Sequence, residues 1–346
     1  MEHQSIMQKP INERASAMTP ASPAPLIEAA NVSKSFIVSD GPLRRLRRQP
    51  PVRLHAVRDL SLTIERGETV SLVGESGCGK TTFGRCMVRL YRPSGGHILH
   101  NGVDIFAPGA RDRRDRGAVQ MIFQDPYSSL NPRMTVSQTL GEVVRVQRGL
   151  TGHAVAHRVS ELLEQVGLLP YLAARYPNQL SGGQRQRVGI ARALAVEPDV
   201  IVCDEAVSAL DVSVQAQVLN LLVRLQDELG LTYLFIAHNL GVVRHISKRV
   251  SVMYLGRVIE TGDVEELFRS PLHPYSQALL RAMPIMDTRR RSLEEAVTGD
   301  LPSPIAPPPG CPFHPRCPHA MPRCREERPR LKMVAPGRTV ACFLHE

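Results

Sequence analysis

Apolar runs and amphipathic segments alternate along the chain from Leu26 to about Val264. Three β-rich or continuously apolar runs are Thr69–Val73, Val200–Cys203 and Leu231–Ile236. Runs of this kind are typical of strands that are buried on both faces. Before the second run, Val188, Ala191 and Leu194 recur at helical spacing, and Pro198 marks the end of that helix. The alternation predicts an α/β fold with a mainly parallel sheet covered by helices.

A glycine-rich turn follows the first of these runs and precedes a predicted helix. Its residues are Gly74, Glu75, Ser76, Gly77, Cys78, Gly79, Lys80 and Thr81, with Thr82 next in the chain. They fit the phosphate-binding pattern G-x-x-x-x-G-K-[ST] in the strand-to-helix context that this pattern requires. The glycines let backbone N–H groups wrap phosphates, Lys80 supplies a positive charge, and the Thr81 hydroxyl is a ligand for Mg²⁺. The sequence therefore predicts a P-loop that binds ATP and Mg²⁺.

Two acidic residues follow the buried run Val200–Cys203. Asp204 closes that strand, where a P-loop protein needs a carboxylate to hold Mg²⁺. Glu205 comes next, in a position to accept a hydrogen bond from an attacking water. An isolated Asp-Glu pair is usually solvent-facing surface, but its position after a buried strand in a P-loop chain favours a catalytic role.

Composition and charge restrict the class of protein and its possible partners. The 346 residues are 42% hydrophobic and 22% charged, as in ordinary globular proteins, and no apolar run of about 18 residues predicts a bilayer span. Residues 1–25 are polar and proline-bearing, which predicts a disordered tail. The net charge of +10 fits a nucleic-acid binder, a surface facing anionic lipid, or neither. A basic cluster comprises Arg44, Arg45, Arg47, Arg48 and Arg53; a solvated loop is favoured there over contact with phospholipid.

The segment Leu180–Gln184 reads LSGGQ and resembles the signature of ATP-binding cassette (ABC) proteins. Ser181 can cap a helix whose N–H groups present a second anion site, so one chain would carry two phosphate-binding helix starts. The resemblance implies that Ser181, Gly182, Gly183 and Gln184 bind the ATP held by the Lys80 loop of a partner in a head-to-tail dimer. It also implies an ABC cassette over residues 26–264, with a small antiparallel β-subdomain and a helical subdomain at about residues 125–185.

Further positions match family landmarks in order. The resemblance implies that Gln124 contacts the metal and water, that Asp211 lies in the loop crossing the dimer interface, and that His238 is a switch histidine near the γ-phosphate. Phe36 is a candidate for stacking on adenine, with a core role as the alternative. Ala206-Val207 and Asn239 depart from common family residues, but neither departure removes a catalytic group. The intact Lys80, Asp204, Glu205 and His238 argue against a degenerate, regulatory cassette.

Residues 265–346 resemble the C-terminal extension of dipeptide/oligopeptide permease ATPases, a family that includes nickel and glutathione importers. The resemblance rests on Ser270–Ser276 and on the segment Cys311–Cys317, and Asp204–Asp211 resembles the second, F-type subunit. It implies an ATPase that powers import, most commonly of peptides. The implied partners are a homologous cassette, two transmembrane permease subunits and, indirectly, an extracytoplasmic solute-binding protein. The implied location is the cytoplasmic face of a bacterial inner membrane.

Four cysteines, Cys311, Cys317, Cys324 and Cys342, lie in a small C-terminal domain with the spacing C-x₅-C-x₆-C-x₁₇-C. Clustered cysteines in a reducing compartment more often bind metal than form disulfides. Structural zinc sites usually have closer pairs, and the family can carry an iron–sulfur cluster here, so a [4Fe–4S] cluster is favoured over Zn²⁺. Unligated cysteines are the third alternative.

A soluble ABC ATPase acting on nucleic acid is the competing class of function. The sequence pI of about 9.6 and the cysteine cluster support it. The chain lacks a long heptad insertion and a second cassette, and it has the permease-type extension. No nucleic-acid partner is therefore expected.

Overall fold

The structure, a computed structural model, describes residues 24–39, 51–107, 117–282 and 302–346. The predicted disordered tail lies almost wholly outside these ranges, and so do Arg44, Arg45, Arg47 and Arg48 of the basic cluster. Within the described ranges, no helix combines the length and apolar character that crossing a bilayer requires.

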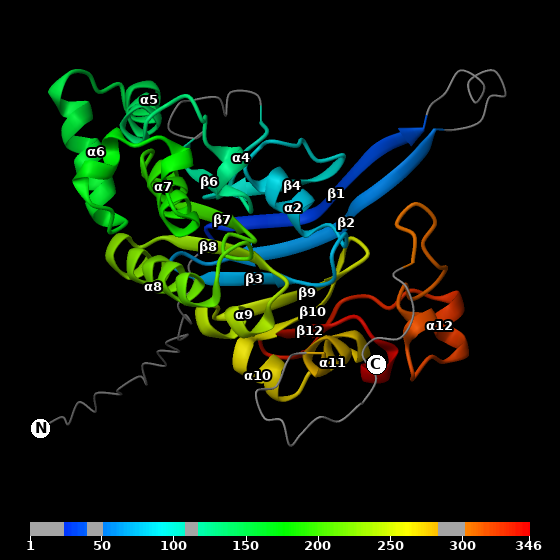
Figure 1. Cartoon of the computed structure of the whole chain (residues 1–346). Helices are drawn as coiled ribbons and strands as arrows, with labels where there is room; N and C mark the ends of the chain where they lie inside the picture. Colours follow the sequence, from blue (N-terminus) through cyan, green and yellow to red (C-terminus); the bar gives the residue numbers. More distant parts are fainter. Residues whose placement is uncertain (1–23, 40–50, 108–116, 283–301) are drawn as a thin grey trace, which may run out of the picture.

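An eight-stranded sheet runs through the centre of the molecule (Figure 1). In spatial order its strands are β11 (Lys332–Ala335), β12 (Arg338–Val340), β10 (Arg257–Asp263), β9 (Arg249–Tyr254), β3 (Thr69–Val73), β8 (Thr232–Ala237), β7 (Val200–Asp204) and β6 (Val119–Ile122). The strands from β9 to β6 pair in parallel, whereas β9, β10, β12 and β11 pair antiparallel. The predicted α/β class with a mainly parallel central sheet is confirmed.

The central strands are apolar throughout because both faces of the sheet are covered. Side chains alternate between faces along a strand, so Val200 and Val202 join one core cluster while Ile201 and Cys203 join the other. The first face packs on α2 (Lys80–Met87). The second packs on α7 (Gly182–Leu194), α8 (Val212–Leu229) and α9 (Leu240–Ile246).

A second, antiparallel sheet lies over the α2 face. Its strands, in spatial order, are β2 (Val52–Ile64), β1 (Ile27–Ser39), β4 (Gly95–His100) and β5 (Val103–Asp104). Buried residues of this sheet, including Ile27, Leu60 and Ile98, share one core cluster with Phe83 and Met87 of α2. The small antiparallel β-subdomain is therefore packed directly against the helix that begins at the P-loop.

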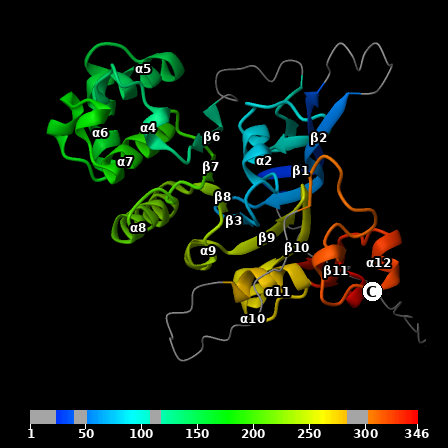
Figure 2. The ribbon, with the colours of Figure 1, turned by 45° about the vertical axis from the view of Figure 1, so that its right-hand side comes forward.

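A helical region lies at the opposite end of the molecule from the β1–β2 hairpin (Figures 1 and 2). It contains α4 (Pro126–Ser129), α5 (Val136–Arg148), α6 (His153–Gln165), the 3₁₀ turns η1 (Pro170–Ala174) and η2 (Pro177–Gln179), and the start of α7. Helix α5 begins with a capping box between Thr135 and Gln138, and it buries Leu140 and Val144 in the same cluster as Val155 of α6.

The C-terminal residues continue the central sheet. Strand β12 pairs with β10 in the register Glu260↔Val340 and Thr261↔Thr339. Around these strands lie α10 (Val264–Arg269), α11 (Pro274–Arg281), η4 (His314–Arg316), α12 (Pro322–Glu326) and η5 (Phe343–His345). The predicted boundary at residue 265 thus separates segments that share one sheet.

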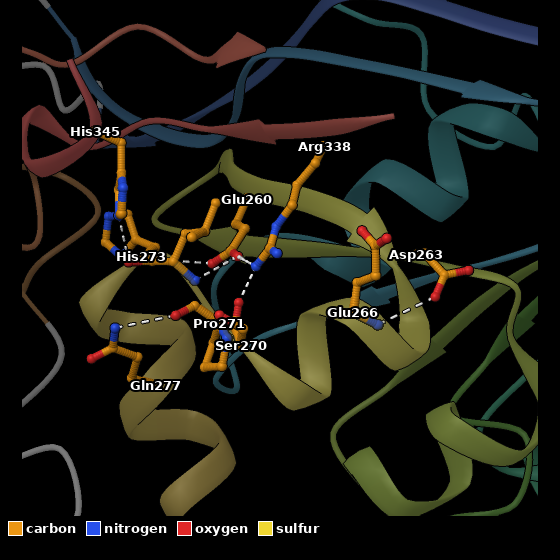
Figure 3. Close-up of polar contacts among 10 residues, drawn as sticks. Glu260, Asp263, Glu266, Ser270, Pro271, His273, Gln277, Arg338 and His345 are labelled. Carbon is orange, nitrogen blue, oxygen red and sulfur yellow. Dashed lines mark hydrogen bonds and ion pairs between the residues drawn. The ribbon is translucent and has the colours of Figure 1, made fainter. Parts of the chain in front are cut away.

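Glu260 connects these segments (Figure 3). Its side chain is 0% exposed, and its two carboxylate oxygens accept hydrogen bonds of 2.8 Å from the N–H groups of Leu272 and His273. Arg338 of β12 reaches the same carboxylate at 3.4 Å and also donates to the Ser270 carbonyl. The buried carboxylate is therefore paired on three sides, as a buried charge must be.

Candidate active site

The P-loop joins β3 to α2 and lines a cavity of about 500 Å³. Ser76, Gly77, Cys78, Gly79, Lys80, Thr81 and Thr82 line this cavity. The Lys80 side chain is 4% exposed, and its ammonium donates to the carbonyls of Gly74 at 2.7 Å and Glu75 at 3.0 Å. Lys80 is therefore held inside the loop, next to the space where the loop's N–H groups would bind phosphates.

Two of the loop's glycines are required by packing as well as by conformation. Gly79 has φ 109°, and a Cβ there would lie 2.0 Å from the Ala56 carbonyl oxygen. Gly74 has φ 151°, and a Cβ there would lie 2.2 Å from the Met253 carbonyl oxygen. The loop thus runs against β2 and β9, and any side chain at these positions would displace backbone.

Thr81, which lines the cavity, forms an oxygen-rich pair with the buried Asp204. The Thr81 hydroxyl donates to the Asp204 carboxylate at 2.8 Å, and the Asp204 residue is 3% exposed. Burial raises the pKa of Asp204 above its usual range, and the Thr81 hydrogen bond opposes that shift. Hard oxygen donors of this type suit Mg²⁺, whose charge would favour the ionised carboxylate. The donor set fits the predicted metal.

Glu205, Gln124 and His238 come together from three separate strand ends. Gln124 donates to the Glu205 carboxylate at 2.7 Å, and His238 Nδ1 lies 3.4 Å from the same oxygen. Glu205 and Gln124 line the cavity. The backbone of Glu205 has φ 48°, a region uncommon for non-glycine residues and often found at functional sites. The Glu205 N–H is fixed to the Ile236 carbonyl at 2.9 Å, so this backbone is anchored to β8.

Phe36 also lines the cavity, which is compatible with the predicted contact to adenine. Its ring packs edge-on against Tyr91 at 5.3 Å, and the Lys34 ammonium lies 5.1 Å from its centroid. The stacking role therefore stays a prediction.

The signature segment begins a helix elsewhere on the molecule. Ser181 is the N-cap of α7: its hydroxyl accepts the Gln184 N–H at 3.2 Å, and the Gln184 side chain accepts the Ser181 N–H at 2.9 Å. Gly183 is packed so closely that a Cβ would lie 2.5 Å from a Val214 methyl. The described residues that line the P-loop cavity do not include the signature residues or the predicted interface residue, namely Ser181, Gly182, Gly183, Gln184 and Asp211. One chain therefore presents two separate helix starts of a kind that can bind anions.

The four C-terminal cysteines face a second, small cavity of about 10 Å³. The Cys311 N–H donates to the Cys324 carbonyl at 2.8 Å, which ties the two halves of the segment together. Burial raises the pKa of Cys311 to about 11, with further contributions from Cys324, Cys342 and Cys317. However, no group of three or more His, Cys, Asp or Glu side chains within the described ranges is arranged to hold a metal ion. The predicted cluster is thus not supported, although all four cysteines line one small cavity.

Sequence reasoning missed two contacts to the P-loop. Tyr275 and Arg316 both bind Glu75, from segments far along the chain. Tyr275 lies in the segment Ser270–Ser276 and Arg316 between two of the cysteines, but neither segment carries a local signal of contact with the loop. His55 and Pro304 also line the cavity and were not identified.

The fold and this site define a P-loop ATPase of the ABC cassette class. Comparison with protein families agrees: residues 57–208 match the ABC transporter family, and residues 259–324 match the oligopeptide/dipeptide transporter C-terminal region. The chain belongs to the family of ATP-binding subunits of oligopeptide and dipeptide ABC transporters.

Relatives match nearly the whole chain. The oligopeptide transport ATP-binding protein AppF of Bacillus subtilis (strain 168) is 48% identical over 95% of this chain and 100% of its own length. The dipeptide transport ATP-binding protein DppF of Haemophilus influenzae is 45% identical over 92% of this chain and 96% of its own. Among solved structures, the dimeric ABC transporter cassette MJ0796 matches with a TM-score of 0.60 and 28% identity, over 69% of this chain and 98% of that one. The same cassette, in a dimeric post-hydrolysis state bound to ADP and Pi, matches with a TM-score of 0.59.

Proposed function

We propose that this chain hydrolyses ATP to power the import of dipeptides or oligopeptides through an ABC transporter. The observation that carries the catalytic part is the Glu205 carboxylate, which opens onto the P-loop cavity between Gln124 and His238. Family membership and the names of the relatives support the transport part.

Each residue in the cavity has one task in this proposal. The P-loop N–H groups and Lys80 bind the β- and γ-phosphates. Thr81 and Asp204 hold Mg²⁺, which supplies neutralisation of the phosphate charge when bound. Glu205 orients the attacking water and accepts its proton, while Gln124 fixes the carboxylate by donating to one of its oxygens. His238 contacts the γ-phosphate and links that contact to Glu205.

Glu205→Gln tests this assignment because the amide keeps the size of the side chain and loses the basic oxygen. The kcat for ATP hydrolysis should fall by about 10²-fold or more, with MgATP binding retained. Glu228→Gln is a matched control, because Glu228 lies on the surface of α8 in an exposed pair with Arg224. Steady-state hydrolysis by Glu205→Gln within about threefold of the unmodified chain would contradict the role proposed for Glu205.

The active form in this proposal is a head-to-tail dimer with a homologous cassette. Each ATP would lie between the Lys80 loop of one subunit and the Ser181 helix start of the other, with Asp211 at the interface. The separation of the two anion-binding helix starts within one chain supports this arrangement. Glu205→Gln with MgATP and the partner should sediment as a dimer, and Ser181→Arg should abolish that species. An unchanged dimer with Ser181→Arg would contradict the arrangement.

The dimer would act at the cytoplasmic face of a bacterial inner membrane, on two permease subunits that receive peptide from an external binding protein. The region around Gln124 would transmit closure of the cassettes to the permeases. Hydrolysis by the assembled transporter in proteoliposomes should rise with peptide-loaded binding protein. A response to nickel or glutathione in place of peptide would contradict the peptide assignment and leave the ATPase assignment intact.

We also propose that Cys311, Cys317, Cys324 and Cys342 together bind a [4Fe–4S] cluster, with Zn²⁺ as the alternative. The lining of one small cavity by all four cysteines supports the proposal. Such a group would join the two halves of a small segment that has few large apolar side chains. Protein purified without oxygen should contain four iron and four sulfide per chain, and Cys324→Ser should lose them. Cys86→Ser, at a buried cysteine of α2, is the control. One zinc or no metal would contradict the cluster.

A further inference from the structure

Glu75, the second residue of the P-loop, is bound by the C-terminal segment through a two-pronged ion pair. Arg316 Nη1 lies 2.9 Å from one Glu75 carboxylate oxygen and Nη2 lies 2.8 Å from the other. The Arg316 side chain is 6% exposed and that of Glu75 is 25% exposed. Paired parallel hydrogen bonds of this kind are among the stronger and more directional charged contacts in proteins.

The backbone of Glu75 is held as well. Its N–H donates to the Tyr275 hydroxyl at 2.9 Å, and its carbonyl accepts from the Lys80 ammonium at 3.0 Å. Tyr275 is 0% exposed, and its ring lies 4.7 Å from that of Tyr254 and 5.4 Å from that of Phe313. One P-loop residue therefore receives contacts from α11, from η4 and from the phosphate-binding lysine.

The turn that carries Arg316 is held by backbone hydrogen bonds and by packing. Arg316 belongs to η4, where its N–H donates to the Phe313 carbonyl at 3.0 Å and the His314 N–H donates to the Cys311 carbonyl at 3.0 Å. Phe313 is 2% exposed and also packs on Tyr254 at 5.4 Å. The turn that carries the guanidinium is thus anchored in the same aromatic cluster as Tyr275.

The charge of Glu75 is unfavourable for a loop that binds polyphosphate. A carboxylate one residue from the start of the P-loop repels phosphate oxygens, and partial burial strengthens that repulsion. Arg316 offsets this charge, and its two hydrogen bonds also fix the orientation of the Glu75 side chain.

We propose that Arg316 is a positioning residue for nucleotide binding: by pairing with Glu75 it neutralises and orients the P-loop, so that the cysteine-bearing segment sets the affinity for MgATP. The inference rests on the proposed nucleotide site. It assigns to the C-terminal extension a role within the ATPase itself. Arg316 acts through Glu75 and does not contact the nucleotide in this proposal.

A double-mutant cycle tests the inference, using the full-length chain and the affinity for MgATP measured by calorimetry. Arg316→Gln should weaken MgATP binding about tenfold, because it leaves an unpaired Glu75 carboxylate in the loop, next in the chain to Ser76, which lines the cavity. In the Glu75→Gln background the same replacement should change affinity less than about threefold, since no charge remains to be offset. Arg316→Gln should raise KM more than it lowers kcat.

Arg323→Gln is the matched control. Arg323 lies on α12 of the same segment and pairs with Glu327 and Glu346, away from the P-loop. Its replacement should leave affinity unchanged. Equal losses for Arg316→Gln in both backgrounds, or no loss in either, would overturn the inference. Absence of MgATP binding by the unmodified chain would instead contradict the proposed function.

A second variant covers the case in which Arg316→Gln fails to fold. Arg316→Lys keeps the positive charge and loses the two-pronged geometry. It should keep MgATP affinity within about threefold, while the backbone amides of residues 74–78 exchange faster with deuterium. Unchanged exchange in this loop, or a loss of MgATP affinity greater than about threefold, would overturn the inference.

Discussion

Removing the Glu260 carboxylate should release the C-terminal segment from the central sheet. The side chain is 0% exposed and accepts two backbone N–H groups at 2.8 Å and the Arg338 guanidinium at 3.4 Å. Glu260→Ala leaves the N–H groups of Leu272 and His273 without this acceptor and Arg338 without its counter-ion. Nothing else in β10 or β12 changes.

The cost follows from these contacts. Each buried donor left unpaired costs about 1–3 kcal/mol, and removing one partner of a buried ion pair costs about 3–5 kcal/mol. These terms overlap because the same carboxylate supplies all of them, so the expected loss is about 3–5 kcal/mol in the free energy of unfolding. Glu260→Gln keeps one acceptor oxygen and should lose roughly half as much.

Hydrogen exchange measures the loss locally. Amides of β12 and of the start of α11 should exchange faster in Glu260→Ala, while those of the buried strand β3 keep their protection. Glu266→Ala is the control, because Glu266 is an exposed residue of the neighbouring helix α10 (Figure 3). In urea unfolding, the free energy of unfolding should fall most in Glu260→Ala, roughly half as much in Glu260→Gln, and least in Glu266→Ala. A loss below about 1 kcal/mol, or faster exchange spread evenly over β3 and β12, would refute the reasoning.

The remaining predictions concern two helix starts. His273 is 2% exposed, and burial, with a smaller contribution from His345, lowers its pKa from 6.5 to about 3. The unfolded chain therefore binds a proton that the folded chain does not, so stability is full above about pH 6.5 and falls by up to about 1.4 kcal/mol per pH unit toward pH 3. His273→Asn keeps the acceptor for the Tyr275 N–H and should flatten this slope in urea titrations; an unchanged slope would contradict it. Ser181→Ala removes the α7 cap and should lower the urea midpoint by the equivalent of about 0.5–2 kcal/mol, with Ser181→Gly costing a few tenths; equal losses would exclude a capping effect.

Much of the nucleotide site could be predicted from local sequence pattern. Gly74 to Thr81 are contiguous, and a phosphate loop needs a strand before it and a helix after it, so both its residues and its surroundings were predictable. The same holds for β3, β7 and β8, whose apolar runs indicated burial on both faces. Family resemblance implied that Gln124 contacts the metal and water, whereas its 2.7 Å hydrogen bond to Glu205, 81 residues away, came from the fold.

The sequence by itself determined the class of fold, the P-loop, the acidic strand end and the family, because each is encoded by neighbouring residues whose conformations and chemistry are local. Only the tertiary structure decided that β12 extends the central sheet at β10, and that Arg316 and Tyr275 hold Glu75 from 241 and 200 residues away. A contact across such a separation depends on how completed elements pack, and no spacing along the chain encodes it. The glycines of the P-loop depend on both the sequence and the tertiary structure. Their pattern is local, but the backbone oxygens of Ala56 and Met253, which exclude a side chain at Gly79 and Gly74, come from distant strands.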